Sequence, residues 1–495
     1  MATSLISTGV EFADATVQTT AAVAGGGSAE IVASGSLSDG STVVINADGT
    51  VSVVAGAAQA VGTPVVFESA ASSYISSAYD SINQKVVVVY QDEGNSSFGT
   101  AIVGTVSGTS ISFGTAVVFE SASTPDIHAT YDSTSQKIVI SYRDAGNLNY
   151  GTAIVGTVSG TSISFGTAVV FANSYTFASN ITYDSTNNKV VIVYSPDSNS
   201  YYGTAIVGTV SGTSISFGTA VVYNSASTDN NYAIYDSTNQ KVVIAYQDGG
   251  NSSFGTAIVG TVSGTSITFG FESVFESAAS SAISATYDST NNKVVIAYRD
   301  SGNSSYGTAI VGTISGTSIS FGTPIVFESA NSVYISAVYN SSAQKVVITY
   351  SDFGNSGFGT AIIGTVSGTS ISFGTAVVFL SAGTSSSSAT YDSTNNKVVI
   401  AYRDGGNSNF GTSVVFQNAG TNLTSENYIG ISDGAYADTA TATIQLAGAV
   451  DDAQSGLTAG RSYYVQSDGT LNTTAGTPSV FAGTAVSSTK LIVKG

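Results

Sequence analysis

One unit is repeated along most of this chain at a constant interval of 52 residues. Each copy carries a tyrosine followed by Asp, or by Asn in one copy, and these tyrosines are Tyr79, Tyr131, Tyr183, Tyr235, Tyr287, Tyr339 and Tyr391. Periods near 50 residues that contain several short strands are typical of β-propellers and β-solenoids. The repeat therefore predicts an all-β array, and we number its copies one to seven by these tyrosines.

Each copy of the repeat predicts four strands. In the fifth copy the runs ISATYD, KVVIAYRD, GTAIVGTV and TSITFG alternate with STNN, SGNSS and SGTS. Clusters of Ser, Asn, Gly and Thr favour turns, so the apolar runs between them are strands. The KVVIAY run is apolar almost throughout, which means that both faces of its sheet must be covered. Sheets stacked against one another meet that requirement.

The ends of the array decide between an open solenoid and a closed ring. The seventh copy supplies three strands, because GTSVVF at 411–416 is followed by unrelated sequence. The missing fourth strand occurs at the other end, where VGTPVVFES at 61–69 matches FGTAVVFES at 113–121 one period later. A strand from the front of the chain thus completes the last sheet and removes the unpaired edges. We predict a seven-bladed β-propeller.

The flanking segments are expected to join the propeller on one face. In a sheet of up-and-down strands, the hairpins between strands one and two and between strands three and four share a face. The array starts at a fourth strand and ends after a third, so both flanks should leave from the hairpin face, and the opposite face is free. The predicted organisation is an N-terminal attachment and oligomerisation segment (1–40), the propeller (41–416) and a small β-rich C-terminal domain (417–495).

The predicted free face is also the one that varies. The hairpin turns are nearly constant, as YDSTNNK at 183–189 shows, whereas the connections on the opposite face differ between copies. Varied loops on a rigid scaffold are typical of a recognition surface. Aromatic residues beside Asn and Ser suit carbohydrate, although such side chains can equally be exposed without a ligand. The candidate ligand-binding residues, which the copies do not share, are Tyr74, His128, Arg143, Tyr175, Phe177, Tyr232, Arg299, Tyr334, Phe353 and Arg403.

Charge and hydropathy limit the partners. The formal net charge is −19, from 13 Lys and Arg against 32 Asp and Glu, which repels nucleic acid and acidic membranes. The apolar runs have the length of strands and are interrupted by Gly, Ser and Thr, so membrane insertion is not expected. Without cysteine, disulfides cannot stabilise the fold.

The sequence offers little material for catalysis or for a cofactor. A single histidine, His128, and no cysteine give no nucleophile with its base and no metal centre. His128 itself is expected to be an ordinary exposed side chain if it binds no ligand. In six copies the Asp after the repeat tyrosine stands five residues before a Lys across a hairpin, which indicates a turn with at most a weak ion pair. Loops such as Asp248–Ser252 could offer oxygens to calcium, but plain turns are the simpler interpretation.

An aromatic residue precedes a glycine once in every copy. Because all copies share it, we expect it to pack in the core or between blades. These residues are Phe98, Tyr150, Tyr202, Phe254, Tyr306, Phe358 and Phe410.

The flanks carry a resemblance to virion proteins. GVEFADATVQTTAA at 9–22 resembles the N-terminal segment of many bacteriophage tail-fibre and head-fibre proteins, and residues 455–495 are similar to the terminal module of marine phage structural proteins. The resemblance implies an appendage on tail or capsid that joins other virion proteins through its N-terminal segment and forms a homo-oligomer such as a trimer. The N-terminus lacks the charged and apolar regions of a classical secretion signal. The protein is therefore expected at the virion surface, made in the host cytoplasm and released by lysis.

Three functions are compatible with the sequence. The leading expectation is a non-enzymatic bacteriophage surface protein whose propeller face binds a host-surface glycan or protein, with repeated sites that add avidity. The alternative is a purely structural decoration of capsid or tail without a host ligand. A polysaccharide-degrading enzyme would need two carboxylates in unlike environments. That third function is disfavoured, since the acidic residues of the repeats recur identically.

Overall fold

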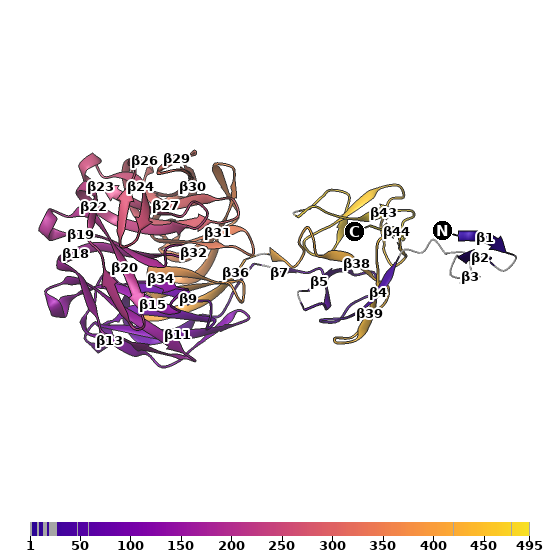
Figure 1. The fold of residues 1–495 in the computed structure, drawn as a ribbon, viewed down its shortest axis with the longest axis horizontal. Helices are drawn as coiled ribbons and strands as arrows, with labels where there is room; N and C mark the ends of the chain where they lie inside the picture. Colours follow the sequence, from indigo (N-terminus) through magenta and orange to yellow (C-terminus); the bar gives the residue numbers. More distant parts are fainter. Residues whose placement is uncertain are drawn as a thin grey trace. The chain divides into compact units, whose positions relative to one another are not determined.

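The chain forms two compact units in the computed structural model (Figure 1), which describes residues 2–6, 9–12, 17–18, 27–46, 48–57, 59–418, 420–476 and 478–494. One unit is Ala60–Asn418. The other is built from both flanks, Met1–Gln59 and Ala419–Gly495. In the part of the chain that is described, no helix has the length and apolar character needed to cross a membrane.

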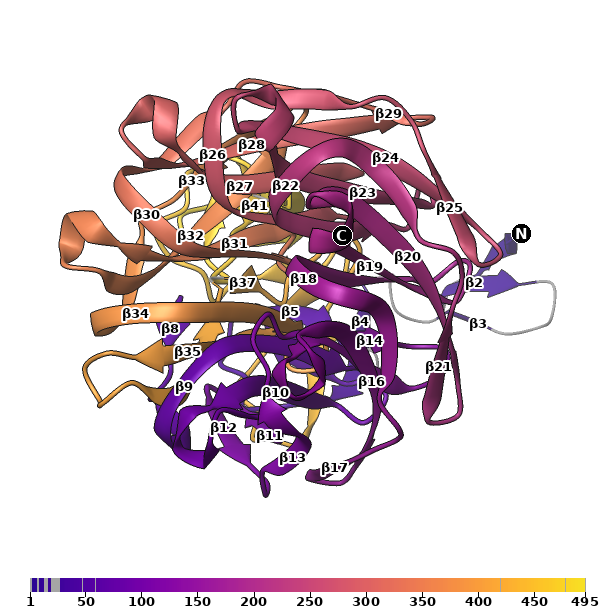
Figure 2. The same cartoon turned by 90° about the vertical axis from the view of Figure 1, so that its left-hand side faces the viewer.

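The first unit is a closed ring of antiparallel strands, which confirms the predicted propeller fold. Strand pairing runs from β10 (Lys85–Asp92) around the ring to β36 (Phe410–Gln417). The last strand then pairs with β8 (Ala60–Val61) and β9 (Val65–Asp80), placing Phe416 opposite Val61. An N-terminal strand thus completes the last sheet, as the sequence predicts. Figure 2 looks onto one face of this ring.

Most sheets are joined by a continuous strand rather than by the loop that the sequence suggests. The first part of β9 pairs with β36 and its second part with β10. A bulge lies within the second part, between Ser73 and Ser76, where Tyr74 has a left-handed φ of 48°. One residue of this kind adds the twist that carries the chain from one sheet to the next. The other strands of this type are β18 (Val169–Asp184), β22 (Val221–Asp236), β26 (Ser273–Asp288), β30 (Ile325–Asn340) and β34 (Val377–Asp392), while β13 (Val117–Ser123) and β14 (His128–Asp132) are separate.

The remaining elements of the ring follow the same repeat. The second strands are β10, β15 (Lys137–Asp144), β19 (Lys189–Pro196), β23 (Lys241–Asp248), β27 (Lys293–Asp300), β31 (Lys345–Asp352) and β35 (Lys397–Asp404). The third strands are β11 (Phe98–Ser107), β16 (Tyr150–Ser159), β20 (Tyr202–Ser211), β24 (Phe254–Ser263), β28 (Tyr306–Ser315), β32 (Phe358–Ser367) and β36. Short strands begin each fourth strand, at β12 (Ser110–Phe113), β17 (Ser162–Phe165), β21 (Ser214–Phe217), β25 (Ser266–Phe269), β29 (Ser318–Phe321) and β33 (Ser370–Phe373).

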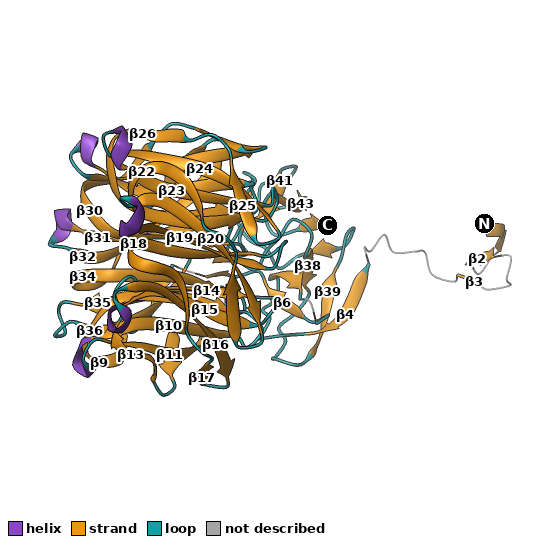
Figure 3. Ribbon diagram, turned by 60° about the vertical axis from the view of Figure 1, so that its left-hand side comes forward, coloured by secondary structure: helices purple, strands orange, loops and turns teal. Residues whose placement is uncertain are grey.

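Short 3-10 helices follow the second strands on one side of the propeller (Figure 3). They are η1 (Glu93–Asn95), η2 (Ala145–Asn147), η3 (Asp197–Asn199), η4 (Gly249–Asn251), η5 (Ser301–Asn303) and η6 (Phe353–Asn355).

Buried tyrosines of the second strands supply the aromatic packing. Tyr298 is fully buried, its ring centroid lies 5.1 Å from that of Phe275, and its hydroxyl donates to Glu276 at 3.0 Å. The aromatic residues before glycine, exemplified by Tyr306, are instead half-buried and take part in no close ring pair among the described residues. The sequence does not identify the buried tyrosines of the second strands, because a tyrosine within an apolar run carries no distinct signal.

The repeat tyrosine and its Asp have separate structural roles. The Asp236 carboxylate accepts from the backbone N–H of Thr238 at 2.9 Å and of Asn239 at 2.8 Å, which confirms the predicted turn. No ion pair joins such an Asp to its Lys in the described residues. The Tyr235 hydroxyl donates to Thr186 in the preceding copy at 2.6 Å, and Tyr79 bonds in the same way across the ring closure.

The second unit contains two five-stranded sheets. One has the order β4 (Ser28–Val32), β39 (Thr441–Gln445), β38 (Tyr428–Ser432), β5 (Thr42–Ile45) and β6 (Val51–Val53). The other has the order β40 (Val450–Asp451), β44 (Leu491–Val493), β43 (Val480–Ala485), β41 (Ser462–Val465) and β42 (Leu471–Asn472). A two-stranded pair, β7 (Gly56–Ala57) with β37 (Gly420–Thr421), and a three-stranded sheet, β1 (Ala2–Ile6), β2 (Gly9–Phe12) and β3 (Val17–Gln18), complete it.

These sheets correct the domain boundaries drawn from the sequence. Residues 41–59 were expected in the propeller, and 28–40 in a separate N-terminal segment. Both stretches belong to the unit formed with the C-terminal flank. The reason is physical: β5 buries Val43 and Val44 completely, and its pairing partner is β38. Pairing between segments so far apart in the sequence leaves no local signal in either segment.

Candidate functional site

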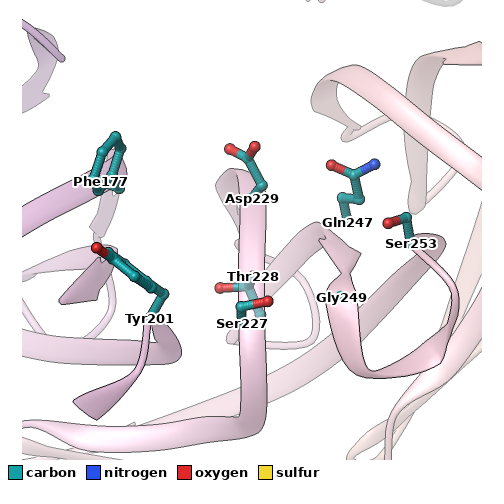
Figure 4. Close-up of a pocket in the computed structure, with 8 residues that line it drawn as sticks. All are labelled: Phe177, Tyr201, Ser227, Thr228, Asp229, Gln247, Gly249 and Ser253. Carbon is teal, nitrogen blue, oxygen red and sulfur yellow. The ribbon is translucent and has the colours of Figure 1, made fainter. Parts of the chain in front are cut away.

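A pocket of about 410 Å³ lies on the face of the propeller that carries the short helices. It is formed where the third and fourth copies of the repeat meet, and Figure 4 shows its lining. The lining residues are Phe177, Tyr201, Ser227, Thr228, Asp229, Gln247, Gly249 and Ser253. The pocket therefore combines one aromatic side with one polar side.

Phe177 and Tyr201 form the aromatic side, which we call the aromatic wall. Phe177 is 42% exposed and Tyr201 is 41% exposed, so ring surface is free for a ligand. Their centroids are 5.6 Å apart in an edge-to-face arrangement, and the ring of Tyr175 lies 4.7 Å from that of Phe177. Tyr201 follows η3 with a left-handed φ of 63°, which turns its side chain toward Phe177.

Arg143 lies behind the aromatic wall. Its guanidinium carbon is 4.5 Å from the ring centroid of Tyr175 and 5.2 Å from that of Phe177, within the range of cation–π attraction. It also donates a hydrogen bond to the Tyr175 hydroxyl, and its Nε lies 3.6 Å from the Asp126 carboxylate. Arg143 is only 9% exposed. The residue therefore contacts the wall rather than the open pocket.

Asp229, Gln247 and Ser253 provide polar groups of the pocket lining (Figure 4). Asp229 is exposed, and one of its oxygens accepts from the backbone N–H of Asn230 at 2.7 Å. The Asn230 amide donates to Gln247 Oε1 at 3.3 Å, which orients the Gln247 side chain and leaves its NH₂ for a ligand. The pocket thus offers a carboxylate acceptor, an amide donor and a hydroxyl group opposite two rings.

The other candidates from the sequence do not gather at this pocket. Tyr74 and Tyr334 are 43% and 47% exposed and stand at the bulges of β9 and β30. Phe353, at the start of η6, is 56% exposed. Arg299 donates to Ser305 at 3.0 Å, and Arg403 forms an ion pair with Glu93 at 3.1 Å.

His128 and Tyr232 lie in a second cavity, of about 400 Å³, where the first strands of the copies meet. His128 was expected at the end of an exposed loop, but it begins β14, and its Nδ1 lies 3.3 Å from the Asn180 amide. Burial lowers its pKa to about 4, so the imidazole is neutral near pH 7.

The polar groups of this second cavity hold neighbouring sheets together. Asn180 accepts from the backbone N–H of Ala233 at 3.0 Å, and Ser388 accepts from that of Ser77 across the ring closure at 3.0 Å. Most other copies have serine where the second has His128, at Ser76, Ser284, Ser336 and Ser388. Since these groups are already bonded, we assign the cavity a structural role.

Replacing His128 with Ser should make the protein less sensitive to acid. The folded pKa is about 4 and the unfolded value is about 6.5, so below pH 6.5 the unfolded chain binds the proton first. His128 therefore destabilises the fold progressively as pH falls from about 6.5 to about 4. Denaturant unfolding at several pH values should show that the free energy of unfolding of the variant rises relative to that of the wild type as pH falls through this window. A constant difference between the two would contradict the assignment.

The Asp side chains before the short helices bond to the backbone of these helices. Asp248 accepts from the backbone N–H of Gly250 at 2.9 Å, and Asp300 bonds in the same way to Gly302 and Asn303. Within the described ranges, no group of three or more His, Cys, Asp or Glu side chains could hold a metal ion. These carboxylates serve as helix caps, which satisfy otherwise unpaired N–H groups.

Of the eight lining residues, sequence reasoning identified only Phe177. Those it missed include Tyr201, Asp229, Gln247 and Ser253. Two of them carry a signal that could have been used. Tyr201 is the only tyrosine at its repeat position, where the other copies have Ser, Asn or Gly, and Asp229 is the only acidic residue at its own. Gln247 and Ser253 recur in other copies, so only the structure brings them to the site.

Comparison with known proteins supports the fold. No protein-family model matches this sequence, and no curated protein matches it. Among solved structures, the chain is similar to the BP39L lectin from Burkholderia pseudomallei, with a TM-score of 0.52, 9% identity, and coverage of 72% of this chain and 99% of the lectin. It is also similar to the β-propeller domain of Cps50 (Swd1) from Myceliophteria thermophila, with a TM-score of 0.49, 7% identity, and coverage of 71% and 99%. At such low identity, the similarity to the lectin shows the propeller fold and nothing finer.

Proposed function

We propose that the propeller binds carbohydrate and that the pocket between the third and fourth copies holds a sugar. The observation that carries this proposal is the aromatic wall opposite Asp229, Gln247 and Ser253. A sugar ring has an apolar face, which stacks on aromatic side chains, and hydroxyl groups at its edge, which need acceptors and donors. The pocket is concave and provides both kinds of contact, as ligand sites do. The similarity in fold to a propeller lectin gives independent support.

We further propose that this binding serves a bacteriophage particle at the surface of its host. The support is the resemblance of residues 9–22 and 455–495 to phage appendage proteins. A virion presents many copies of such a protein, so weak binding of single sugars would add up to firm attachment. In this proposal the propeller acts as a non-enzymatic adhesin. A purely structural decoration would lack the sugar-binding activity.

Truncating the aromatic wall should weaken attachment. We expect Phe177→Ala and Tyr201→Ala each to lower the affinity of the labelled full chain for host cells about tenfold or more, because each removes a central stacking surface. Purified surface polysaccharide should compete with the wild type. Phe353→Ala is the matched control, since this phenylalanine is exposed on the loop equivalent to the one that carries Tyr201 but lies outside the pocket. Equal binding by all four proteins would remove the pocket from the proposal.

A further inference from the structure

The charge around the pocket constrains the class of sugar. Asp229 is an exposed carboxylate in the lining, and neither Lys nor Arg is among the lining residues. Arg143 is the nearest cation to the wall, but it is 9% exposed and paired with Asp126. The whole chain carries a formal charge of −19. An anionic ligand would therefore meet a negative site in a negative field.

The hydrogen-bonding groups lead to the same class. A carboxylate accepts but does not donate, so Asp229 suits sugar hydroxyl groups and repels a carboxylate or sulfate. Gln247 and Ser253 can donate to ring or hydroxyl oxygens without adding charge. We infer that the pocket selects uncharged sugars over acidic sugars and that Asp229 is the residue that sets this preference. This inference rests on the proposed carbohydrate-binding function.

The test compares neutral and acidic monosaccharides on the full chain. Galactose, glucose and mannose are titrated against glucuronic acid and N-acetylneuraminic acid at low ionic strength. We expect at least one neutral sugar to bind about tenfold or more tightly than either acid, and Asp229→Asn to reduce that ratio several-fold because it keeps the shape and removes the charge. Added salt should narrow the ratio in the wild type only.

The possible outcomes separate the two proposals. Equal or tighter binding of the acidic sugars, with loss of binding in Phe177→Ala, overturns the selectivity but keeps the carbohydrate site. A preference for neutral sugars that Asp229→Asn leaves unchanged overturns the role of Asp229. Absence of binding for every sugar overturns both the selectivity and the proposed function.

A separate observation concerns the two five-stranded sheets of the second unit. LSDGSTVVINADGTVSVVAG at 37–56 aligns without a gap with LTAGRSYYVQSDGTLNTTAG at 457–476. In both turns a backbone carbonyl, of Asn46 or of Gln466, accepts from the N–H of the glycine three residues later at 3.0 Å. The carboxylates of Asp48 and Asp468 each accept from the N–H of the threonine two residues later, also at 3.0 Å. The hairpins β5–β6 and β41–β42 are thus equivalent.

The equivalence extends through both sheets. Ile431 pairs with Thr42 as Thr484 pairs with Ser462. Each of these two strand pairs has a bulge at the equivalent place. Next in order come β39 and β4 in one sheet, and β44 and β40 in the other. A Cβ on Gly430 would lie 2.0 Å from the carbonyl oxygen of Gln445, and one on Gly483 would lie 2.1 Å from that of Ile492.

The two sheets differ in what separates their hairpin from the next strand along the chain. In the sheet β40–β44, β42 ends at Asn472 and β43 begins at Val480. In the other sheet, β6 ends at Val53 and β38 begins at Tyr428, with the whole propeller between them. We infer that the second unit is a tandem pair of one β module and that the propeller is an insertion into the first module. The propeller is then a separate ligand-binding element inserted into a unit that folds without it.

This inference predicts independent unfolding of the two units. Scanning calorimetry of the full chain should show two transitions. Gly430→Ala and Gly483→Ala should each lower the temperature of the same transition, whereas Gly166→Ala should lower the temperature of the other. A variant that lacks residues 60–418 should still give the transition of the second unit, because the two ends of the deleted stretch are paired at Ala60 and Gln417. A single shared transition in the full chain, or failure of the shortened variant to fold, would contradict the insertion.

Discussion

Replacing Gly166 with Ala is expected to lower the free energy of unfolding of the propeller by about 3 kcal/mol. A Cβ at this position would lie 1.8 Å from the carbonyl oxygen of Thr213 in the next copy. No side-chain rotation can relieve a contact between Cβ and backbone, so the two sheets must move apart. The same close approach occurs at Gly62, Gly114, Gly218, Gly270 and Gly322.

The chain provides a matched control for this substitution. Gly374 occupies the same repeat position, but the sequence that follows the seventh copy departs from the repeat, and the nearest atom to its Cβ is 3.9 Å away. Gly374→Ala should therefore change stability by no more than about 0.5 kcal/mol. Urea unfolding of both variants measures the difference. Similar effects at the two positions would show that packing between the sheets does not explain this glycine.

Replacing Arg143 with Gln is expected to weaken sugar binding about tenfold although Arg143 does not face the open pocket. The substitution removes the cation over Tyr175 and Phe177 and the ion pair with Asp126, which together hold the aromatic wall. Interactions of these kinds contribute about 0.5–2 kcal/mol each in favourable settings. Glutamine is accommodated in this strand position, since the first and fourth copies have Gln91 and Gln247 there.

The control is Arg299→Gln at the same repeat position. Arg299 donates to Ser305, and no aromatic ring lies over its guanidinium among the cation–π contacts of the described residues. We expect its sugar affinity to match the wild type. Titrations well below the unfolding temperature separate loss of the wall from loss of the fold. Unchanged affinity in Arg143→Gln would mean that Phe177 and Tyr201 need no support from behind.

The sequence predicts the ring well because the ring depends on a periodic signal. The 52-residue interval and the match between 61–69 and 113–121 were enough to place β8 and β9 beside β36. The sequence predicts the pocket only in part. Phe177 is a candidate ligand-binding residue because the other copies lack it, whereas Asp229 and Gln247 are not among the candidates. Pockets between copies depend on which side chains meet across two sheets, and a pattern within one copy does not contain that information.

The second unit was harder to predict for a different reason. Residues 42–44 pair with residues 428–431, so the partner of this strand lies beyond the whole propeller in sequence. In neither segment do apolar and polar residues alternate strongly enough to identify its partner. The aligned stretches 37–56 and 457–476 hold the signal that was available, because an internal duplication places two distant segments in equivalent folds.

The central claim is that the pocket between the third and fourth copies binds a sugar. Calorimetric titration of the full chain with neutral monosaccharides, for the wild type and the Phe177→Ala/Tyr201→Ala double variant, tests it most directly. We predict saturable binding by the wild type and at least a tenfold loss in the double variant, with the unfolding temperature of the propeller unchanged. Binding that survives in the double variant would place the sugar elsewhere, and absence of binding in the wild type would contradict the claim.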